Sequence, residues 1–228
     1  MIKFFRRIRY DLMEKNKTGK YFKYAIGEIV LVVIGILIAL SINTWNETRK
    51  QDITEKEIIN GIKNDLTKDK EYIKRIINLA ENKNSVFIIL NEELFNYYNY
   101  NRRVLDSLLV EYFKTQNTFY PIYGSYQSAI SGNEISKFKN KEFSSAVTKL
   151  YNSTYARLMD NAISADERWH YLTKKYSHIR RTDKIYDMTP TELTEFLNEM
   201  YYHMFGLNYY SNNLSAAIEE IDKLLLQN

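Results

Sequence analysis

The sequence has no cysteine, and only two prolines and seven glycines in 228 residues. Without cysteine, the chain can form no disulfide framework, no thiolate nucleophile and no cysteine-ligated metal site, although this does not identify a compartment. Sheets and long loops need turn residues, so the scarcity of proline and glycine favours long helices. The length suffices for one membrane segment and one domain with its own core.

The excess of positive charge belongs to a short N-terminal head. The formal net charge is +4, but residues 1–23 hold eight lysines and arginines against two acidic residues, a net of +6. The remaining 205 residues therefore carry a net charge of −2. A nucleic-acid-binding protein would place its positive charge on the folded domain, so we expect no nucleic-acid partner.

Residues 24–45 form an apolar run bounded by Tyr24 and Trp45. As a helix, this run would span roughly 33 Å, the thickness of a bilayer core. Its twelve Ile, Leu and Val side chains favour insertion by roughly 4–7 kcal/mol. A charge at mid-membrane costs about 2.5–3.5 kcal/mol, and Glu28, near the end of the run, should cost less. The sequence therefore predicts a transmembrane helix over 24–45 with the lipid bilayer as its partner. A signal peptide cleaved near Ala39-Leu40-Ser41 is the weaker interpretation, because its basic lead would be unusually long.

The flanking charges predict the orientation of this helix. Basic residues precede it, and charges of both signs balance after it, so the positive-inside rule places residues 1–23 in the cytoplasm and residues 46–228 outside. Residues 1–23 also have an amphipathic pattern, which would hold Arg6, Arg7 and Arg9 at an anionic membrane surface. The alternative is a disordered tail that only sets the topology.

The stretch "YAIGEIVLVVIGILIALSINTWNETR" (24–49) resembles the start of an uncharacterised bacterial family of single-pass membrane proteins. That family opens with a basic segment, a run close to YAIGEIVLVVIGILIAL, and then N-x-W-N-E-x-R. The stretch "FYPIYGSYQSAISGNEISKFKNKEF" (119–143) is similar to a second, weaker family pattern. The resemblance implies a membrane anchor and a helical domain, and no known activity. With the charge asymmetry, it places the chain in a bacterial inner membrane with a periplasmic C-terminal domain.

Glu28 shares one face of the apolar helix with three small residues. At 100° per residue, Gly27, Glu28, Gly35 and Ala39 fall within a sector of about 120°. Gly35-x-x-x-Ala39 is a small-x-x-x-small pair, which lets helices approach closely. We therefore predict a homo-oligomer contact through this face. Two alternatives stay open: Glu28 reaches the headgroups from one turn inside the boundary, or it relays protons as in stator subunits of ion-driven motors.

Apolar residues at helical spacing fill the remainder of the chain, and no strand-like alternation is present. The predicted fold class is all-α, with the transmembrane helix continuing into an antiparallel bundle of long helices. The apolar stripe of the first helix has one exception, Asp69. Helices are predicted over 59–94 with a break near 81–85, over 102–113, over 143–179, and from a capping box at 189–192 to 225, with Gly206 marking a kink. Residues 116–140 are predicted to be loop-like, with a short helix at "SYQSAIS".

Catalytic motifs are missing from the sequence. Glu167-x-x-His170 is half of a di-metal motif, but neither His178 nor His203 follows a glutamate at that spacing, so surface residues beside Trp169 are the simpler interpretation. No phosphate loop or nucleophile elbow is present, so we expect no enzyme, cofactor or metal. The 20 tyrosines include clusters at 96–101 and 201–210 that would suit sugars or proteins, although compositional bias together with core packing is the simpler explanation.

These observations favour a membrane-anchored, self-associating scaffold whose partner is a membrane or periplasmic protein. The alternative from another class is a sensor that binds a small ligand or glycan in its outer bundle.

Overall fold

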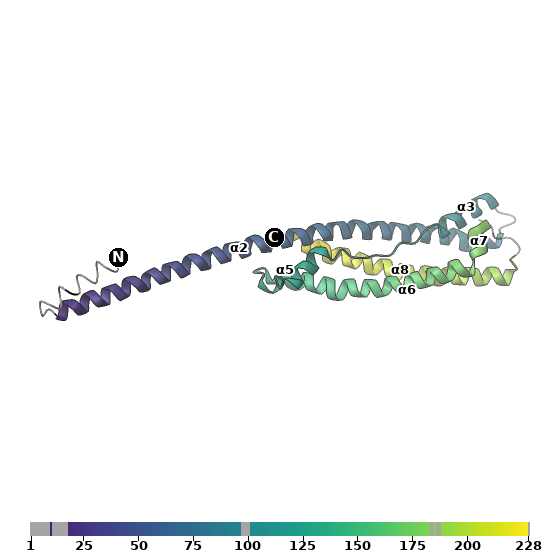
Figure 1. Cartoon of the computed structure of the whole chain (residues 1–228). Coiled ribbons are helices and arrows are strands. Elements are labelled where there is room, and N and C mark those ends of the chain that lie inside the picture. Colours follow the sequence, from purple (N-terminus) through teal and green to yellow (C-terminus); the bar gives the residue numbers. More distant parts are fainter. Residues whose placement is uncertain (1–9, 11–17, 97–100, 183–184, 186–187, 228) are drawn as a thin grey trace. The chain divides into compact units, whose positions relative to one another are not determined.

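The structure is a computed structural model that describes residues 10, 18–96, 101–182, 185 and 188–227. Every regular element in these ranges is helical, which confirms the all-α fold class (Figure 1). The chain divides into two compact units, residues 1–56 and residues 57–228. The helices are α2 (Thr18–Glu93), α3 (Arg102–Phe113), α4 (Gly124–Ser131), α5 (Lys141–Lys149), α6 (Ala156–Lys175), α7 (Ser177–Thr182) and α8 (Pro190–Leu226), with 3-10 turns at Leu94–Asn96 and Ile135–Lys137 and a π-helical turn at Leu150–Tyr155.

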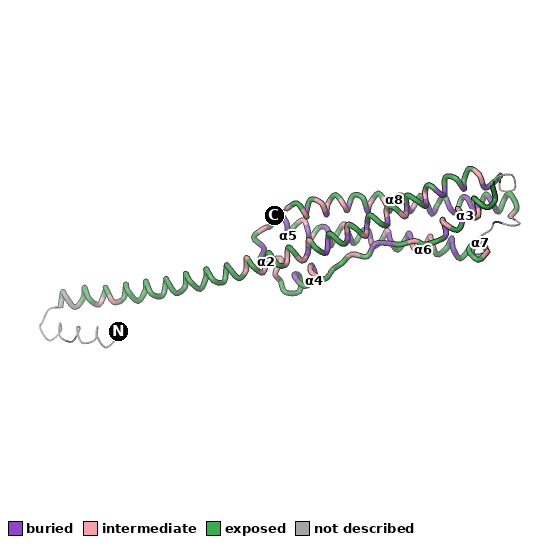
Figure 2. The backbone as a smooth tube through the Cα atoms, turned by 90° about the horizontal axis from the view of Figure 1, so that it is seen from above, coloured by how far each residue is buried: buried purple, intermediate pink, exposed green. Residues whose placement is uncertain are grey.

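Three long helices build the second unit: residues 57–93 of α2, together with α6 and α8. Helix α8 is antiparallel to α2, because Lys70 pairs with Asp222 at one level and Phe87 contacts Tyr201 at another. It is also antiparallel to α6, since Thr154 donates to Glu220 near the start of α6 and Lys175 bonds to Glu195 at its end. Buried residues recur along the facing sides of these helices (Figure 2). The predicted antiparallel bundle is therefore confirmed.

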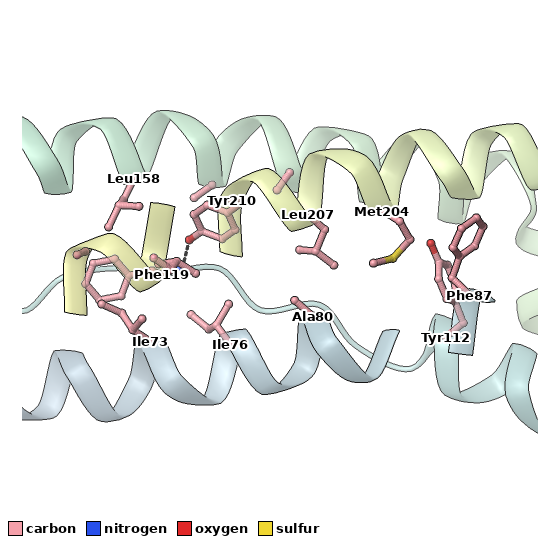
Figure 3. Packing of buried hydrophobic residues seen from close by; sticks show 14 of the residues in the cluster. Ile73, Ile76, Ala80, Phe87, Tyr112, Phe119, Leu158, Met204, Leu207 and Tyr210 are labelled. Atoms are coloured by element: carbon pink, nitrogen blue, oxygen red, sulfur yellow. Dashed lines mark hydrogen bonds between the residues drawn. The ribbon is translucent and has the colours of Figure 1, made fainter. Parts of the chain in front are cut away.

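The apolar side chains of the three helices meet in one continuous core (Figure 3). Ile73, Ile76 and Ala80 of α2 face Leu207 of α8 across this core. Burying an aliphatic side chain of this size contributes about 1.5–3 kcal/mol. The core is thus the main source of stability for residues 57–228.

An extended segment, residues 114–123, runs back along the bundle from the end of α3. It has no regular structure, so side chains of the surrounding helices satisfy its polar groups. The Thr118 hydroxyl donates to Asp166 at 2.9 Å, and the Phe119 backbone N–H donates to the Tyr210 hydroxyl at 2.8 Å (Figure 3). The loop predicted over 116–140 is in this way fixed against α6 and α8, and its predicted short helix is α4.

Asp69, the exception in the apolar stripe, holds the end of this segment. Its carboxylate accepts the Ile122 N–H at 3.1 Å and the Tyr155 hydroxyl at 3.0 Å. One turn earlier, Asp65 accepts the N–H of Ser125 at 3.1 Å. The stretch 119–143 therefore packs on two buried carboxylates of α2.

The predicted break near 81–85 is wrong, because α2 continues through this polar stretch. Two of its polar side chains bind helix α3, which lies antiparallel to α2. Asn82 donates to Glu111 at 3.0 Å, and the Lys83 ammonium donates to the Tyr112 carbonyl. Tyr112 lies in the last turn of α3, where carbonyls lack helical partners, so Lys83 caps that helix.

The single helix predicted over 143–179 needs two corrections. Helix continues from α5 to α6, but Leu150–Tyr155 form a π-helical turn that brings Tyr151 and Tyr155 into the core. Helix α6 then ends at Lys175, because Tyr176 leaves helical geometry with φ −106° and ψ 34°. Ile179 consequently belongs to the separate helix α7.

Helix α8 begins at the predicted capping box. The Thr189 side chain accepts the Glu192 N–H at 3.3 Å, and Glu192 accepts the Thr189 N–H at 2.7 Å. The bonds that the Glu192 carboxylate accepts from Thr189, first that from the backbone N–H, hold the pKa of Glu192 below its usual value. Gly206 interrupts nothing, because α8 is one helix from Pro190 to Leu226.

Candidate functional site

The apolar part of α2 has no cover within the described structure. Its twelve Ile, Leu and Val side chains between residues 26 and 42 are each 46–63% exposed. The only hydroxyl in this interval, that of Ser41, donates to the Leu37 carbonyl at 2.8 Å and so is satisfied within the helix. By its length and composition, helix α2 could cross a membrane.

The four residues predicted to form an oligomer contact lie on this stretch. Gly27, Gly35 and Ala39 are exposed, and Glu28 is half-buried. No atom lies within 4 Å of the place where a Cβ would stand on Gly27 or Gly35, so this side of the helix is open. Arg6, Arg7 and Arg9, predicted at the membrane surface, lie outside the described residues.

A second candidate site is a pocket on the bundle, between α6 and α8. Its volume is about 380 Å³, and it is lined by Glu167, Arg168, Tyr171, Leu172, Glu199, Tyr202 and His203. Pockets for small ligands commonly measure about 300–1,000 Å³. The pocket is therefore of a suitable size for a small molecule.

Arg168 has the most unusual position in this pocket. Its guanidinium carbon lies 4.3 Å from the centroid of the Tyr202 ring, which holds the guanidinium by a cation–π contact. Gly206, one turn beyond Tyr202, provides the room, since a methyl group there would collide with the guanidinium. Among the described residues, Arg168 has no ion pair and its guanidinium donates no hydrogen bond.

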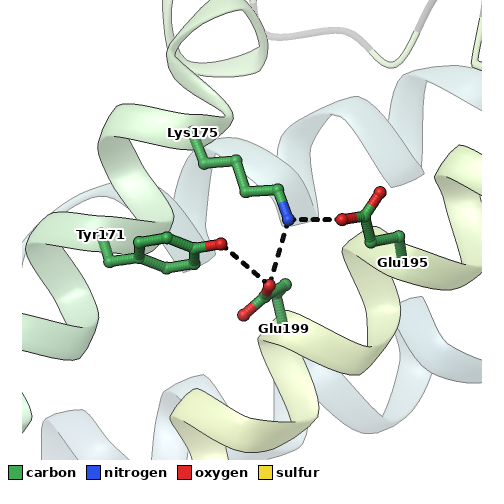
Figure 4. Close-up of polar contacts among 4 residues, drawn as sticks. All are labelled: Tyr171, Lys175, Glu195 and Glu199. Atoms are coloured by element: carbon green, nitrogen blue, oxygen red, sulfur yellow. Dashed lines mark hydrogen bonds and ion pairs between the residues drawn. The ribbon is translucent and has the colours of Figure 1, made fainter.

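A charged cluster forms the rim beside the pocket (Figure 4). The Lys175 ammonium bonds to Glu195 at 2.7 Å and to Glu199 at 3.0 Å, and Tyr171 donates to Glu199 at 3.1 Å. These bonds, first that to Glu195, raise the pKa of Lys175 above its usual value. Glu199 is thus paired with Lys175, which it shares with Glu195, and it also accepts the Tyr171 hydroxyl.

His203 forms the floor of the pocket and is itself only 2% exposed. Its Nε2 lies 2.7 Å from Gln116 Oε1, and its Nδ1 lies 2.8 Å from the Tyr112 hydroxyl. Because the amide oxygen can only accept, Nε2 carries the proton and Nδ1 accepts from Tyr112. Burial lowers the pKa of His203 to about 3, so the ring is neutral and both nitrogens are engaged.

Behind His203 lies Lys83, a buried lysine with an aromatic surround. Its ammonium is 4.0 Å from the Trp169 ring centroid and 5.0 Å from that of Tyr112. Burial lowers its pKa from 10.5 to about 7, and the charge of Glu111 opposes this shift. With its bond to the Tyr112 carbonyl, Lys83 supports the pocket floor and does not line the pocket.

The residues of the half metal motif do not meet other ligands. Glu167 and His170 are both exposed on α6, and Trp169 between them packs partly against the core. Across the described ranges, no group of three or more His, Asp and Glu side chains is placed to hold a metal ion. Of the three histidines, only His203 is at the pocket.

Sequence reasoning missed Arg168 and assigned Gly206 to a kink. Arg168 looks like an ordinary surface arginine in the sequence, because its role depends on Tyr202, which comes 34 residues later on another helix. The signal that could have been used was Gly206 itself. A glycine within a long apolar-patterned helix is costly, and close approach of another group is one reason to keep it.

The fold and the uncovered apolar stretch define a class: a helical-bundle protein with one helix that could cross a membrane. More particularly, the chain belongs to the family of unknown function DUF6090, whose model matches residues 28–200. This match extends from Glu28 in the apolar stretch, across the pocket residues of α6, to the first turns of α8. No curated protein and no solved structure matches the chain.

Proposed function

We propose that this chain is a membrane-anchored scaffold that self-associates through its first helix and displays its bundle to partners outside the cytoplasm, without a catalytic site. One observation carries the proposal. The bundle buries a core of its own, whereas the apolar side chains of residues 26–42 are covered by nothing in the described structure. Exposed apolar surface of this extent is typical of a membrane or an association surface.

The proposed orientation follows from the charges beside the helix. Residues 1–23 carry a net charge of +6, so they stay in the cytoplasm and Asn228 lies on the other side. A reporter enzyme that is active only in the periplasm should be active when fused after Asn228 and inactive when fused after Asn16. The opposite pattern of activity would mean that the orientation is reversed. If both fusion proteins were soluble, the chain would have no membrane anchor.

Self-association is proposed through the face of Gly27, Glu28, Gly35 and Ala39. Gly35→Leu should lower the oligomer fraction in gentle detergent, because a large side chain separates the helices. Interhelical polar contacts contribute about 0.6–1.7 kcal/mol, so Glu28→Leu should weaken assembly by about 3-fold to 20-fold. Glu28→Gln keeps its hydrogen bonding and should have a smaller effect.

Val33→Leu is the matched control, because Val33 lies on the opposite side of the same helix. Mass photometry of the purified chain measures the oligomer distribution. If Gly35→Leu and Glu28→Leu both assemble like the unmodified chain, the contact is not at this face and Glu28 only marks the membrane boundary. If Glu28→Gln instead abolishes an ion-dependent activity in cells, the proton-relay alternative replaces this proposal.

A further inference from the structure

The pocket between α6 and α8 has a use that membrane anchoring and self-association do not require. It is lined by side chains of two helices, and its floor is fixed by the bonds of His203 to Tyr112 and Gln116. A rigid floor of this kind preorganises a binding site. A ligand site in this pocket is therefore independent of the proposed function.

Arg168 provides the recognition chemistry. A guanidinium has five N–H donors in a planar fork that matches the two oxygens of a carboxylate. The cation–π contact with Tyr202, at 4.3 Å, holds the guanidinium without using any of the donors. In the part of the chain that the structure describes, no carboxylate pairs with Arg168, although Glu167 and Glu199 line the same pocket.

Gly206 is the second, independent observation. Glycine inside a helix is less stable than alanine, and α8 keeps it near the middle of 37 residues. The three heavy atoms nearest to the place where a Cβ would stand all belong to the Arg168 side chain. The helix thus accepts a less stable residue at the one position that lets Arg168 lie across it.

The charges around the pocket select the kind of anion. Arg168 supplies one unpaired positive charge, Lys175 is shared between Glu195 and Glu199, and Glu167 adds a further negative charge at the rim. A dianion such as a phosphate monoester would meet repulsion from Glu167, whereas a monoanion would meet less of it. The half-exposed ring of Tyr171 offers apolar surface to the remainder of the ligand.

We propose that this pocket binds a small organic monocarboxylate, with the carboxylate on Arg168 and the apolar body against the ring of Tyr171. The volume of about 380 Å³ suits a molecule the size of one aromatic ring or one sugar. Benzoate is a suitable first ligand, with benzamide and phenyl phosphate as its uncharged and dianionic counterparts.

The test is a titration of the full chain in detergent with each of these three compounds, in which ligand-observed NMR measures binding. Benzoate should bind with a Kd of about 1 mM or tighter, and benzamide and phenyl phosphate should each bind at least about tenfold more weakly. Arg168→Gln should weaken benzoate binding by about tenfold or more. Arg157→Gln, three turns earlier on the same face of α6, is the matched control and should bind like the unmodified chain.

Gly206→Ala separates recognition from folding. The new methyl group should displace the guanidinium and weaken benzoate binding, while the thermal midpoint of the bundle rises because alanine favours the helix. Unchanged benzoate affinity in Arg168→Gln, equal affinity for benzoate and benzamide, or no benzoate binding would each overturn the proposal. Unchanged affinity in Gly206→Ala would overturn the role of Gly206.

Discussion

Lys83 is a single residue whose burial should be measurable in the pH dependence of stability. Its pKa is about 7 in the folded chain, against 10.5 when it is exposed to water. Between these two values the unfolded chain keeps a proton that the folded chain has lost, so raising the pH favours the folded state. Below pH 7 both states are protonated, and the cost of burying the charge is constant.

We therefore expect the free energy of unfolding to rise between pH 7 and pH 9 by up to about 1.4 kcal/mol per pH unit from this group. Lys83→Met should lose this slope, and Lys74→Met, at an exposed position of the same helix, should keep it. Urea titrations of a Trp45→Phe chain report on the bundle alone, because Trp169 is then the only tryptophan. Equal slopes with and without the Lys83→Met substitution would contradict this expectation.

Asp69 acts on stability through the bonds that it accepts. Burial raises its pKa to about 6, so the folded chain binds this proton more tightly and gains stability as the pH falls from 6 toward 4. Removing the carboxylate leaves two donors without their acceptor, the buried Tyr155 hydroxyl and the partly buried Ile122 N–H. Each stranded donor costs about 1–3 kcal/mol.

Asp69→Ala should consequently lower the free energy of unfolding by about 2–5 kcal/mol at pH 7. Glu71→Ala, at an exposed position two residues later, should change it by less than about 0.5 kcal/mol. Chemical denaturation of both variants makes the comparison. A loss below about 1 kcal/mol for Asp69→Ala would mean that residues 118–125 are held mainly by their apolar contacts.

At the scale of an element, the start of α8 depends on two reciprocal bonds between Thr189 and Glu192. Thr189→Ala removes the side-chain acceptor for the N–H of Glu192, so the free energy of unfolding should fall by about 1 kcal/mol. Thr191→Ala, an exposed neighbour outside the capping box, is the control and should have little effect. A cap that contributes nothing would leave the two variants equally stable.

Helix boundaries set by local chemistry could be predicted from the sequence, and those set by distant contacts could not. Helix α3 has the predicted bounds of 102–113, and α8 begins at the predicted cap. The polar stretch 81–85 predicts a break in α2 because it is polar. The prediction fails because its polar side chains bind partners on α3 that lie about 30 residues later in the sequence. Likewise, the π-helical turn exists where Tyr151 and Tyr155 reach Ile122 and Asp69, which apolar spacing alone does not reveal.

The two candidate sites divide in the same way. The face of Gly27, Glu28, Gly35 and Ala39 depends only on the helical repeat, so the sequence was enough to define it. The pocket requires knowledge that Arg168 of α6 lies beside Tyr202 and Gly206 of α8. Gly206 and Tyr202 are visible in the sequence, but only the packing of α6 against α8 shows that they position the Arg168 guanidinium.

At the scale of the whole molecule, the proposed tasks of anchoring and display belong to different parts of the chain. Residues 57–228 form a compact unit with a continuous core, and the exposed apolar side chains of 26–42 lie in the other unit. A chain that begins at residue 57 should therefore be soluble without detergent. It should be strongly helical by circular dichroism and unfold in one cooperative transition.

The same fragment should also be monomeric, since the proposed association face is absent from it. Light scattering after size exclusion measures this directly, with the full chain in detergent as the comparison and Gly35→Leu as the intermediate case. A monomeric fragment beside an oligomeric full chain would assign self-association to residues 1–56. A fragment that forms the same oligomer as the full chain would instead place the contact on the bundle, where the exposed Tyr201, Phe205 and Tyr209 of α8 offer apolar surface one and two turns apart.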